Sequence, residues 1–310
     1  MVTGKGGTGK TAVAAALGLA AARAGLRVLV AEVSPDEQIP ERIEPGSPDS
    51  GYEGRELRPG LRSMQIDPFA ALAEYLGLQI GTPGLVRRVL GTNAFRQLMD
   101  AAPGWRELIT LGKVWHLEQM ELDAGPRYDL IVVDAPATGH GVAFLRVPRV
   151  VVSALRTGPL RRHTLRVEEM LEDAERTLLL PVALAEELPA RETAELVERV
   201  RAEVGIAVDR VVVNAVAAAP FPAELPDLDR RLAALPPELD LGSLPRPRAL
   251  AEAAAFLRAR HELNRGYTAQ IAEATGLPVV ELPYLGQGLD APGALDALAE
   301  ALLAPPRAAA

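Results

Sequence analysis

The sequence predicts an α/β fold with a doubly wound, mostly parallel β-sheet. Three observations support this prediction: apolar, β-branched runs of strand length recur along the chain, helical patterns separate them, and a glycine-rich turn near the amino end leads into a helix. Strands that alternate with helices favour parallel pairing, because each helix returns the chain to the same edge of the sheet. The strand candidates after the turn are residues 26–33, 61–66, 129–134, 177–184, 208–216 and 277–282.

The first element lies in the stretch MVTGKGGTGKTAVAAALGLAAARAG, which allows two interpretations. Two lysines followed by an apolar run with small residues are typical of a secretory signal. Alternatively, the residues from Gly4 to Thr11 match the phosphate-binding loop pattern G-x-x-x-x-G-K-[ST]. Residues 26–33 favour the loop, because a buried strand stands where a phosphate-binding helix ending near Gly25 should return to the sheet.

The chemistry of this loop explains its residue types. Glycines let backbone N–H groups turn inward around phosphate oxygens, and the positive end of the following helix dipole points at the same oxygens. Lys10 supplies a charge for the outer phosphates, and the Thr11 hydroxyl can bind Mg²⁺. The expected nucleotide-binding residues of the loop are Gly4, Gly6, Gly7, Thr8, Gly9, Lys10 and Thr11.

The strand before the loop is short, since only residues 1–3 precede Gly4. A central strand of such a sheet has about five or six residues, and a shorter one leaves backbone groups of its neighbours unpaired. We therefore expect the natural polypeptide to begin upstream of Met1.

The strand candidate at 129–134 ends in Asp134, within YDLIVVDAPATGH. Because the carboxyl ends of parallel strands meet at one edge of the sheet, Asp134 is expected beside the loop, where it can hold Mg²⁺ or its water shell. A helix-cap or turn carboxylate is the alternative role. The backbone N–H of Gly139 could sense a γ-phosphate. His140 is either a catalytic residue or a loop histidine bonded to the backbone.

The rest of the chain supplies helices and loops around these motifs. Helical patterns cover residues 191–204 and 248–274, and residues 149–155 fit a strand by their β-branched side chains or a helix by their position. Residues 219–247 are rich in proline and predict a loop insertion with one short helix. We expect one nucleotide-binding domain over residues 1–304, with helical insertions at about 67–125 and 156–176 and a disordered tail at 305–310.

Composition excludes several classes of function. The 310 residues include 33 basic and 41 acidic side chains, and this net charge of −8, with aromatics at 4%, disfavours a nucleic-acid partner. The chain has no cysteine, so disulfides and thiolate metal sites are ruled out. No apolar run reaches the roughly 18 residues of a membrane-spanning helix.

Lys5 adds a second lysine directly after Gly4, so GKGGTGKT resembles the deviant Walker A motif of a class of dimeric ATPases. In that class the extra lysine reaches across a two-fold interface to the partner's nucleotide; a solvated surface lysine is the alternative. Together with VVDAPATGHGVAFLRVP, the motif resembles the ArsA-type ATPases, which include arsenite-pump ATPases and the tail-anchored-protein targeting ATPase. AAPGWRELITLGKVW, LPVALAEELPARETAEL, VVVNAV and ELPYLGQGL extend the resemblance over essentially the whole chain.

This resemblance implies a Mg-ATP site with Lys5, Lys10 and Asp134 as catalytic residues. It places Asn214 where the family has an adenine-contacting asparagine, and Pro283 in the adenine-side loop. Thr11 and Asp134 are the expected Mg²⁺ ligands.

The sequence departs from the family at three places. Ser34 replaces the switch I aspartate that positions the attacking water, and Asp36 or Glu32 could substitute for it from a different direction. The cysteines of the targeting ATPases' zinc clamp are replaced by Ala254 and Leu257, so no zinc is expected. The chain has five methionines and short insertions, which gives little support to delivery of transmembrane helices.

We expect an ArsA-like Mg-ATPase that acts as a dimeric, nucleotide-driven conformational switch for an unidentified client protein. Its partner is a second copy or a paralogous ATPase, and its location is cytoplasmic or peripheral to the membrane through a partner. The alternative is a nucleotide-binding regulatory subunit with little or no hydrolysis, which the Ser34 substitution favours. A membrane-surface or DNA-partition ATPase fits less well, because residues 294–310 hold no lysine and a single arginine.

Overall fold

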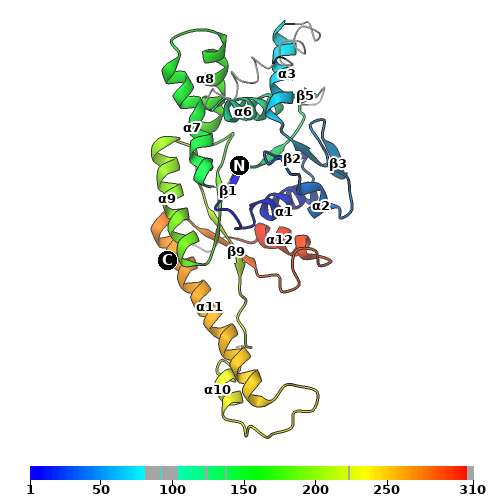
Figure 1. Ribbon diagram of the computed structural model, residues 1–310, viewed down its shortest axis with the longest axis vertical. Coiled ribbons are helices and arrows are strands. Elements are labelled where there is room, and N and C mark those ends of the chain that lie inside the picture. Colours follow the sequence, from blue (N-terminus) through cyan, green and yellow to red (C-terminus); the bar gives the residue numbers. More distant parts are fainter. Residues whose placement is uncertain (81–91, 93–103, 123–124, 137, 223, 306–310) are drawn as a thin grey trace.

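A computed structural model describes residues 1–80, 92, 104–122, 125–136, 138–222 and 224–305. Its centre is an eight-stranded sheet in the order β10-β9-β8-β1-β7-β2-β4-β3, parallel except for β3, which runs antiparallel to β4 (Figure 1). The predicted fold class is confirmed. The strands of this sheet are β1 Val2–Gly4, β2 Val28–Glu32, β3 Arg55–Arg58, β4 Leu61–Gln65, β7 Leu130–Asp134, β8 Leu180–Leu184, β9 Val211–Val216 and β10 Val279–Pro283.

Helices cover both faces of the sheet (Figure 1). Successive residues of β2 alternate between the two cores: Val28 and Val30 pack toward α1 and α12, whereas Leu29 and Ala31 pack toward α6, α7 and α8. A third cluster joins β8 and β9 to α9 and α11. These helices span α1 Lys10–Arg23, α2 Ile39–Ile43, α6 Trp105–Glu118, α7 Thr138–Ala154, α8 Pro159–Glu172, α9 Glu187–Glu203, α11 Pro247–Thr275 and α12 Ala294–Leu303.

The alanine-rich helix α1 lies directly against the sheet. A side chain at Gly18 would place a Cβ 2.5 Å from Val30 Cγ2, so only a residue without a side chain allows this approach. Ala12, Ala14 and Ala16 are 3% exposed or less. The run of small apolar residues is therefore explained by burial of a helix between the sheet and α12.

The described parts of the two expected helical insertions are largely helical. The first contains α3 (Pro68–Ile80), α6 and the small hairpin of β5 (Glu121–Leu122) and β6 (Gly125–Pro126); the second contains α8. Residues 149–155, which fitted either a strand or a helix, are helical up to Ala154, and Pro148 lies inside the same helix. The expected tail at 305–310 lies outside the described residues except for Pro305.

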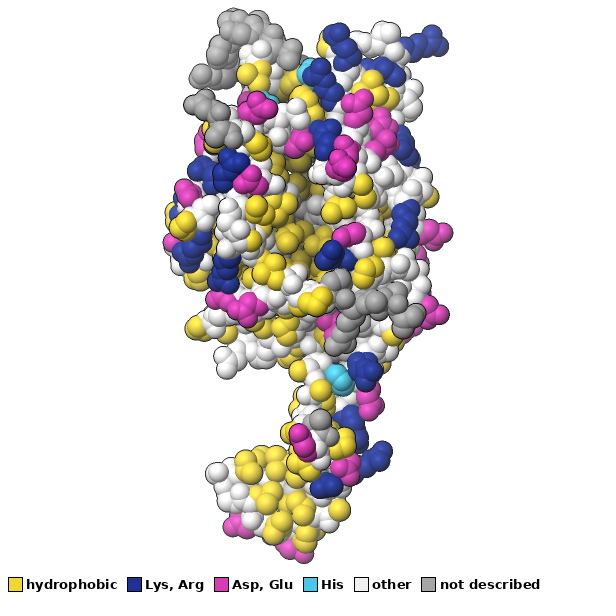
Figure 2. Space-filling model, turned by 180° about the vertical axis from the view of Figure 1, so that it is seen from behind, with side chains coloured by type: hydrophobic (Ala, Val, Ile, Leu, Met, Phe, Trp, Pro, Cys, Tyr) yellow, Lys and Arg dark blue, Asp and Glu magenta, His cyan; other side chains and the backbone are white. Residues whose placement is uncertain are grey.

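The proline-rich stretch 219–247 contains the one short helix expected of it, α10 (Leu228–Ala233). Together with the first turns of α11 it projects from the body of the molecule (Figure 1). Arg258 of α11 pairs with the buried Asp229 of α10, which holds the two helices together. Figure 2 shows hydrophobic side chains gathered on this projection, where Leu244 is 61% exposed.

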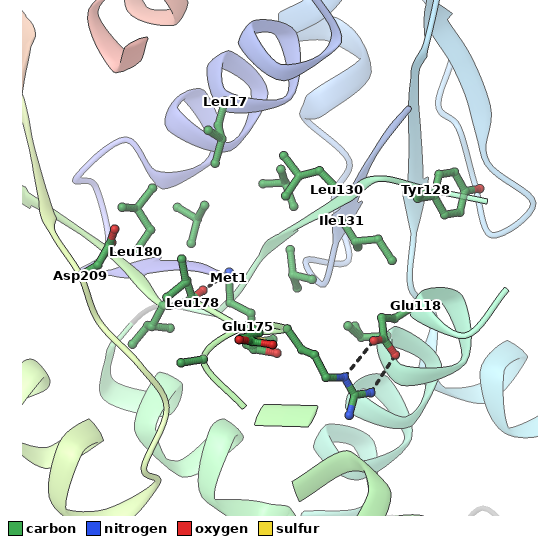
Figure 3. A pocket seen from close by; sticks show the side chains of 18 of the residues that line it. Met1, Leu17, Glu118, Tyr128, Leu130, Ile131, Glu175, Leu178, Leu180 and Asp209 are labelled. Atoms are coloured by element: carbon green, nitrogen blue, oxygen red, sulfur yellow. Dashed lines mark hydrogen bonds and ion pairs between the residues drawn. The ribbon is translucent and has the colours of Figure 1, made fainter. Parts of the chain in front are cut away.

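A cavity of about 620 Å³ lies between β7 and the chain leading into β8, next to Met1 (Figure 3). Leu130, Ile131, Leu178 and Leu180 contribute apolar side chains to it, and the Met1 amino group donates a hydrogen bond to the carbonyl oxygen of Leu178 at 2.7 Å. The cavity is at the amino ends of the parallel strands. Ligands of such sheets bind at the carboxyl ends of the strands, which lie at the opposite edge of this sheet.

Candidate active site

Glycines set the direction of the backbone amides in the loop between β1 and α1. Gly9 precedes α1 with a left-handed conformation (φ 87°), and among the described residues no side chain caps the amides of the first turn. A side chain at Gly9 would also place a Cβ 2.3 Å from the Asn214 amide nitrogen. The free N–H groups and the helix dipole favour an anion at this position.

Lys10 lies folded over the loop. Its Nζ donates to the carbonyl oxygen of Lys5 at 3.2 Å, and the Thr8 hydroxyl donates to the same oxygen at 2.9 Å. Burial lowers the pKa of Lys10, and the nearby Asp134 carboxylate opposes this shift. A phosphate would offer this partly buried ammonium a stronger acceptor than a carbonyl oxygen.

Thr11 and Asp134 form the second part of the site. The Thr11 hydroxyl donates to Asp134 Oδ2 at 2.6 Å, while Asp134 Oδ1 is buried and has no partner in the described parts of the chain. Burial raises the pKa of Asp134, against the effects of the Thr11 hydrogen bond and the Lys10 charge. An unpartnered buried carboxylate oxygen beside a hydroxyl fits Mg²⁺, which usually binds one or two protein oxygens together with phosphates and water.

Glu32 lies next to Asp134 at the end of the neighbouring strand, since the two residues are paired in register between β2 and β7. The Glu32 carboxylate is buried and accepts hydrogen bonds from the backbone N–H groups of Gln38 and Ile39 at 2.8 and 2.9 Å. Burial is the main cause that raises the pKa of Glu32 to about 7, and Asp134 adds to the shift. Glu32 thus fixes the shape of the loop between β2 and α2.

Among the acidic residues of EVSPDEQ, Asp36 is the one that the structure leaves exposed. Glu37 accepts hydrogen bonds from the backbone N–H groups of Ser50 and Gly51 at 2.8 and 2.7 Å, so it is engaged in holding a neighbouring loop. The Ser34 hydroxyl accepts a weak bond from the Asp36 N–H at 3.4 Å. No described contact brings the Asp36 carboxylate to Lys10 or Asp134.

Asn214 and Pro283 lie on the other side of the loop, in an open cleft of about 910 Å³ that also touches Gly7 and Gly9. The Asn214 amide donates to the Thr8 carbonyl oxygen at 2.9 Å and accepts from the Ala215 N–H at 2.9 Å. Ala215 adopts a left-handed conformation (φ 57°) that is uncommon for a residue with a side chain. The structure therefore brings the predicted adenine-side residues to the phosphate-binding loop.

Lys5 has a partner within its own chain. Its Nζ forms an ion pair with Glu192 of α9 at 2.8 Å, and the two side chains are 33% and 31% exposed. Gly139 lies in the first turn of α7, after the strand that ends in Asp134. The side chains of residues 138–140 are not described, so the two alternatives for His140 stay open.

The comparison with known proteins agrees with this geometry. A family model described as anion-transporting ATPase, the ArsA ATPase model, matches residues 1–159. ATPase BagA of Mycobacterium tuberculosis is 33% identical over 97% of this chain and 91% of its own length. The chain belongs to the ArsA ATPase family.

More distant ArsA family members also match. An arsenical pump-driving ATPase of Acidiphilium multivorum is 27% identical, and the match covers 96% of this chain and 53% of that protein. ATPase GET3 of Kluyveromyces lactis is 25% identical over 64% of this chain and 66% of its own length. The predicted resemblance is confirmed, and with it the assignment of the chain as an ATPase.

The positions that correspond to the zinc clamp of the targeting ATPases lie on α11. There Ala254 is buried and Leu257 is 49% exposed. The described residues contain no group of three or more His, Asp or Glu side chains placed to hold a metal ion. Within the described ranges, no helix is long and apolar enough to cross a bilayer.

Sequence reasoning missed three contacts of this site. The first is the contact between Lys5 and Glu192, which lie 187 residues apart in the sequence. The second is the pair of hydrogen bonds that Glu32 accepts from backbone amides after a turn whose shape no local pattern specifies. The third is the Arg260 guanidinium, which lies over the Tyr284 ring at the cleft. Only the charge of these residues was visible in the sequence, and charge alone does not identify a partner.

Proposed function

We propose that this ArsA family ATPase binds Mg-ATP between the loop at residues 4–11 and the Asn214 cleft, and works as a dimeric conformational switch. The observation that carries the proposal is the pair of Thr11 and Asp134, whose unpartnered carboxylate oxygen lies beside the uncapped start of α1. A triphosphate with its metal would satisfy both the free amides and the free oxygen.

The residues of the chain divide the chemistry between them. The backbone amides at the start of α1 and the Lys10 ammonium bind phosphate oxygens and stabilise the charge that develops on them. Thr11 and Asp134 would hold Mg²⁺, which supplies further neutralisation of phosphate charge when bound. Asp36 is the remaining candidate for orienting the attacking water, since Glu32 and Glu37 are engaged with backbone amides.

Dimer formation gives Lys5 its role. In a closed dimer the Lys5 ammonium would leave Glu192 and bind the nucleotide of the partner. An ion pair within one chain would thus be replaced by an ion pair across the interface, between Lys5 and the partner's nucleotide. Both a second copy and a paralogous ATPase are compatible with this step. In this proposal residues 1–304 form one cytoplasmic domain, and the helical insertions at 67–125 and 156–176 change shape for a client protein.

Ser34 favours a second candidate function, a nucleotide-binding regulatory subunit with little or no hydrolysis. Serine cannot accept a proton or hold water as a carboxylate does, and water positioning accounts for much of phosphoryl-transfer catalysis. In this case a paralogous partner would supply the missing aspartate.

Mg-ATP turnover measured in wild type, Lys10→Ala and Lys5→Ala separates these functions. The switch predicts phosphate release by the wild type and a sharp fall in both variants, and equal rates in all three proteins would count against it. Binding of Mg-ATP by calorimetry without any phosphate release would select the regulatory subunit.

A further inference from the structure

Arg260 and Tyr284 form a stacked pair at the end of the Asn214 cleft. The guanidinium carbon of Arg260, on α11, lies 4.4 Å from the centre of the Tyr284 ring, which follows β10. Within the described parts of the chain, no carboxylate forms an ion pair with Arg260. A guanidinium that stacks on a ring keeps its outer face and its N–H groups for another partner.

The cleft connects this pair to the phosphate-binding loop. Gly7 and Gly9 line one part of it, Asn214 and Pro283 line the middle, and Arg260 and Tyr284 line another part together with Phe256 and Leu263. Phe256, Leu263 and Tyr284 are 65%, 54% and 50% exposed. A cleft lined mainly by apolar side chains, with a few polar groups among them, is typical of a site for a flat, partly apolar ligand.

We propose that the Arg260 guanidinium, supported by the Tyr284 ring, is the platform on which the purine base of the bound nucleotide stacks. This inference rests on the proposed function, since it assigns the base end of the same nucleotide site. A base stacked on the outer face of Arg260 would also cover Phe256, one turn earlier on the same helix.

Asn214 then selects among bases by hydrogen bonds. A side-chain amide has two N–H donors and two acceptor lone pairs, and the contacts to Thr8 and Ala215 use one of each. One donor and one acceptor remain, and they match the N7 ring nitrogen and the N6 amino group on the major-groove edge of adenine. On the same edge guanine presents two acceptors, N7 and O6, so it would leave the Asn214 oxygen opposed to another acceptor. Arg260 would therefore contribute affinity for a base, whereas the preference for adenine comes from the contact at Asn214 that the family resemblance already implies.

The test compares Mg-ATP with Mg-tripolyphosphate, which has the phosphates but no base, by calorimetric titration. Wild type should bind ATP more tightly than tripolyphosphate. Arg260→Ala should weaken ATP binding by about 3- to 30-fold, as expected for a stacked guanidinium, and leave tripolyphosphate binding unchanged. Arg260→Lys keeps the charge but not the plane and should weaken ATP binding nearly as much. Arg265→Ala, an exposed arginine on the same helix outside the cleft, is the matched control.

A second pair of variants tests the support beneath the guanidinium. Tyr284→Phe keeps the ring and should retain ATP affinity, whereas Tyr284→Ala should weaken ATP binding as Arg260→Ala does. Equal ATP affinity in wild type and Arg260→Ala would overturn the inference, and so would full affinity in Arg260→Lys. If wild type binds tripolyphosphate and ATP equally, the inference fails but the phosphate site stands. If wild type binds neither, the proposed function itself fails.

Discussion

Replacing Glu32 by glutamine tests whether a buried carboxylate controls the loop between β2 and α2. Glu32 is 1% exposed, accepts two backbone hydrogen bonds and lies beside Asp134 in the sheet. Burial raises the pKa of its carboxyl group from 4.5 to about 7, so the folded protein binds this proton more tightly than the unfolded chain does. Stability from this group is present below pH 4.5 and is lost as the pH rises through about 7.

The size of the effect follows from the shift in pKa. At about 1.4 kcal/mol per pH unit, a rise from 4.5 to about 7 corresponds to roughly 3 kcal/mol of unfolding free energy. Glu32→Gln removes the titration and one of the two accepted hydrogen bonds, and the lost bond costs about 1–3 kcal/mol at every pH. As the pH rises from 4.5 to 8, the unfolding free energy of the variant should therefore increase by roughly 3 kcal/mol relative to that of the wild type.

The assay is urea unfolding of both proteins from pH 4.5 to pH 8, without nucleotide or magnesium, because an ion at Asp134 would change the field at Glu32. Glu37→Gln serves as a control for the loss of a two-amide acceptor at a more exposed carboxylate. If the difference in unfolding free energy between wild type and Glu32→Gln stays constant over this pH range, the pKa of Glu32 is not raised by folding.

Three further predictions concern the nucleotide site. Gly9→Ala should abolish measurable Mg-ATP binding, because its Cβ would lie 2.3 Å from an amide nitrogen; Gly7→Ala, with a similar left-handed backbone and open space, should retain more affinity. Equal losses in calorimetry would contradict the role of the close contact. Glu192→Gln should change stability by less than about 1 kcal/mol, since the ion pair is partly solvated, yet strengthen ATP-dependent dimerisation by releasing Lys5. Light scattering with a slowly hydrolysed ATP analogue checks this, and unchanged dimerisation would argue against it. Asp134→Asn should reduce the magnesium dependence of ATP affinity, since Thr11 remains as a ligand, whereas an unchanged magnesium effect would argue against Asp134 as a ligand.

Most of the fold was predictable because its signals are local. The strands β2, β4, β7, β8, β9 and β10 overlap the predicted ranges, and all of them except β4 are mainly apolar runs bounded by helices or turns. β3 was missed, because Arg55, Glu56 and Arg58 give its four residues the composition of an exposed loop. Residues 149–155 could not be assigned, since their β-branched residues favour a strand, whereas up to Ala154 they continue α7, where Arg149 bonds to Glu168 of α8 and to the Glu203 carbonyl oxygen of α9.

The candidate site was predictable only in part, because some of its residues belong to local motifs and others are brought together from distant segments. The phosphate-binding loop is a continuous motif whose glycines have a stated backbone role, and Asp134 follows a strand that must end at the same edge. The partners of Lys5 and Arg260 come from distant segments. The fold of the chain determines which of the many surface carboxylates or rings lies beside a given lysine or arginine. A pattern in a single sequence does not identify that partner.

Binding of Mg-ATP at the loop of residues 4–11 is tested most directly by calorimetric titration of Mg-ATP into folded wild-type protein and into Lys10→Ala. We expect saturable binding by the wild type at about one nucleotide per chain, and at least about tenfold weaker binding by Lys10→Ala, because the lost contact is a charge-assisted hydrogen bond. If the wild-type protein binds no Mg-ATP, or if Lys10→Ala binds it equally well, the loop at residues 4–11 is not the nucleotide site.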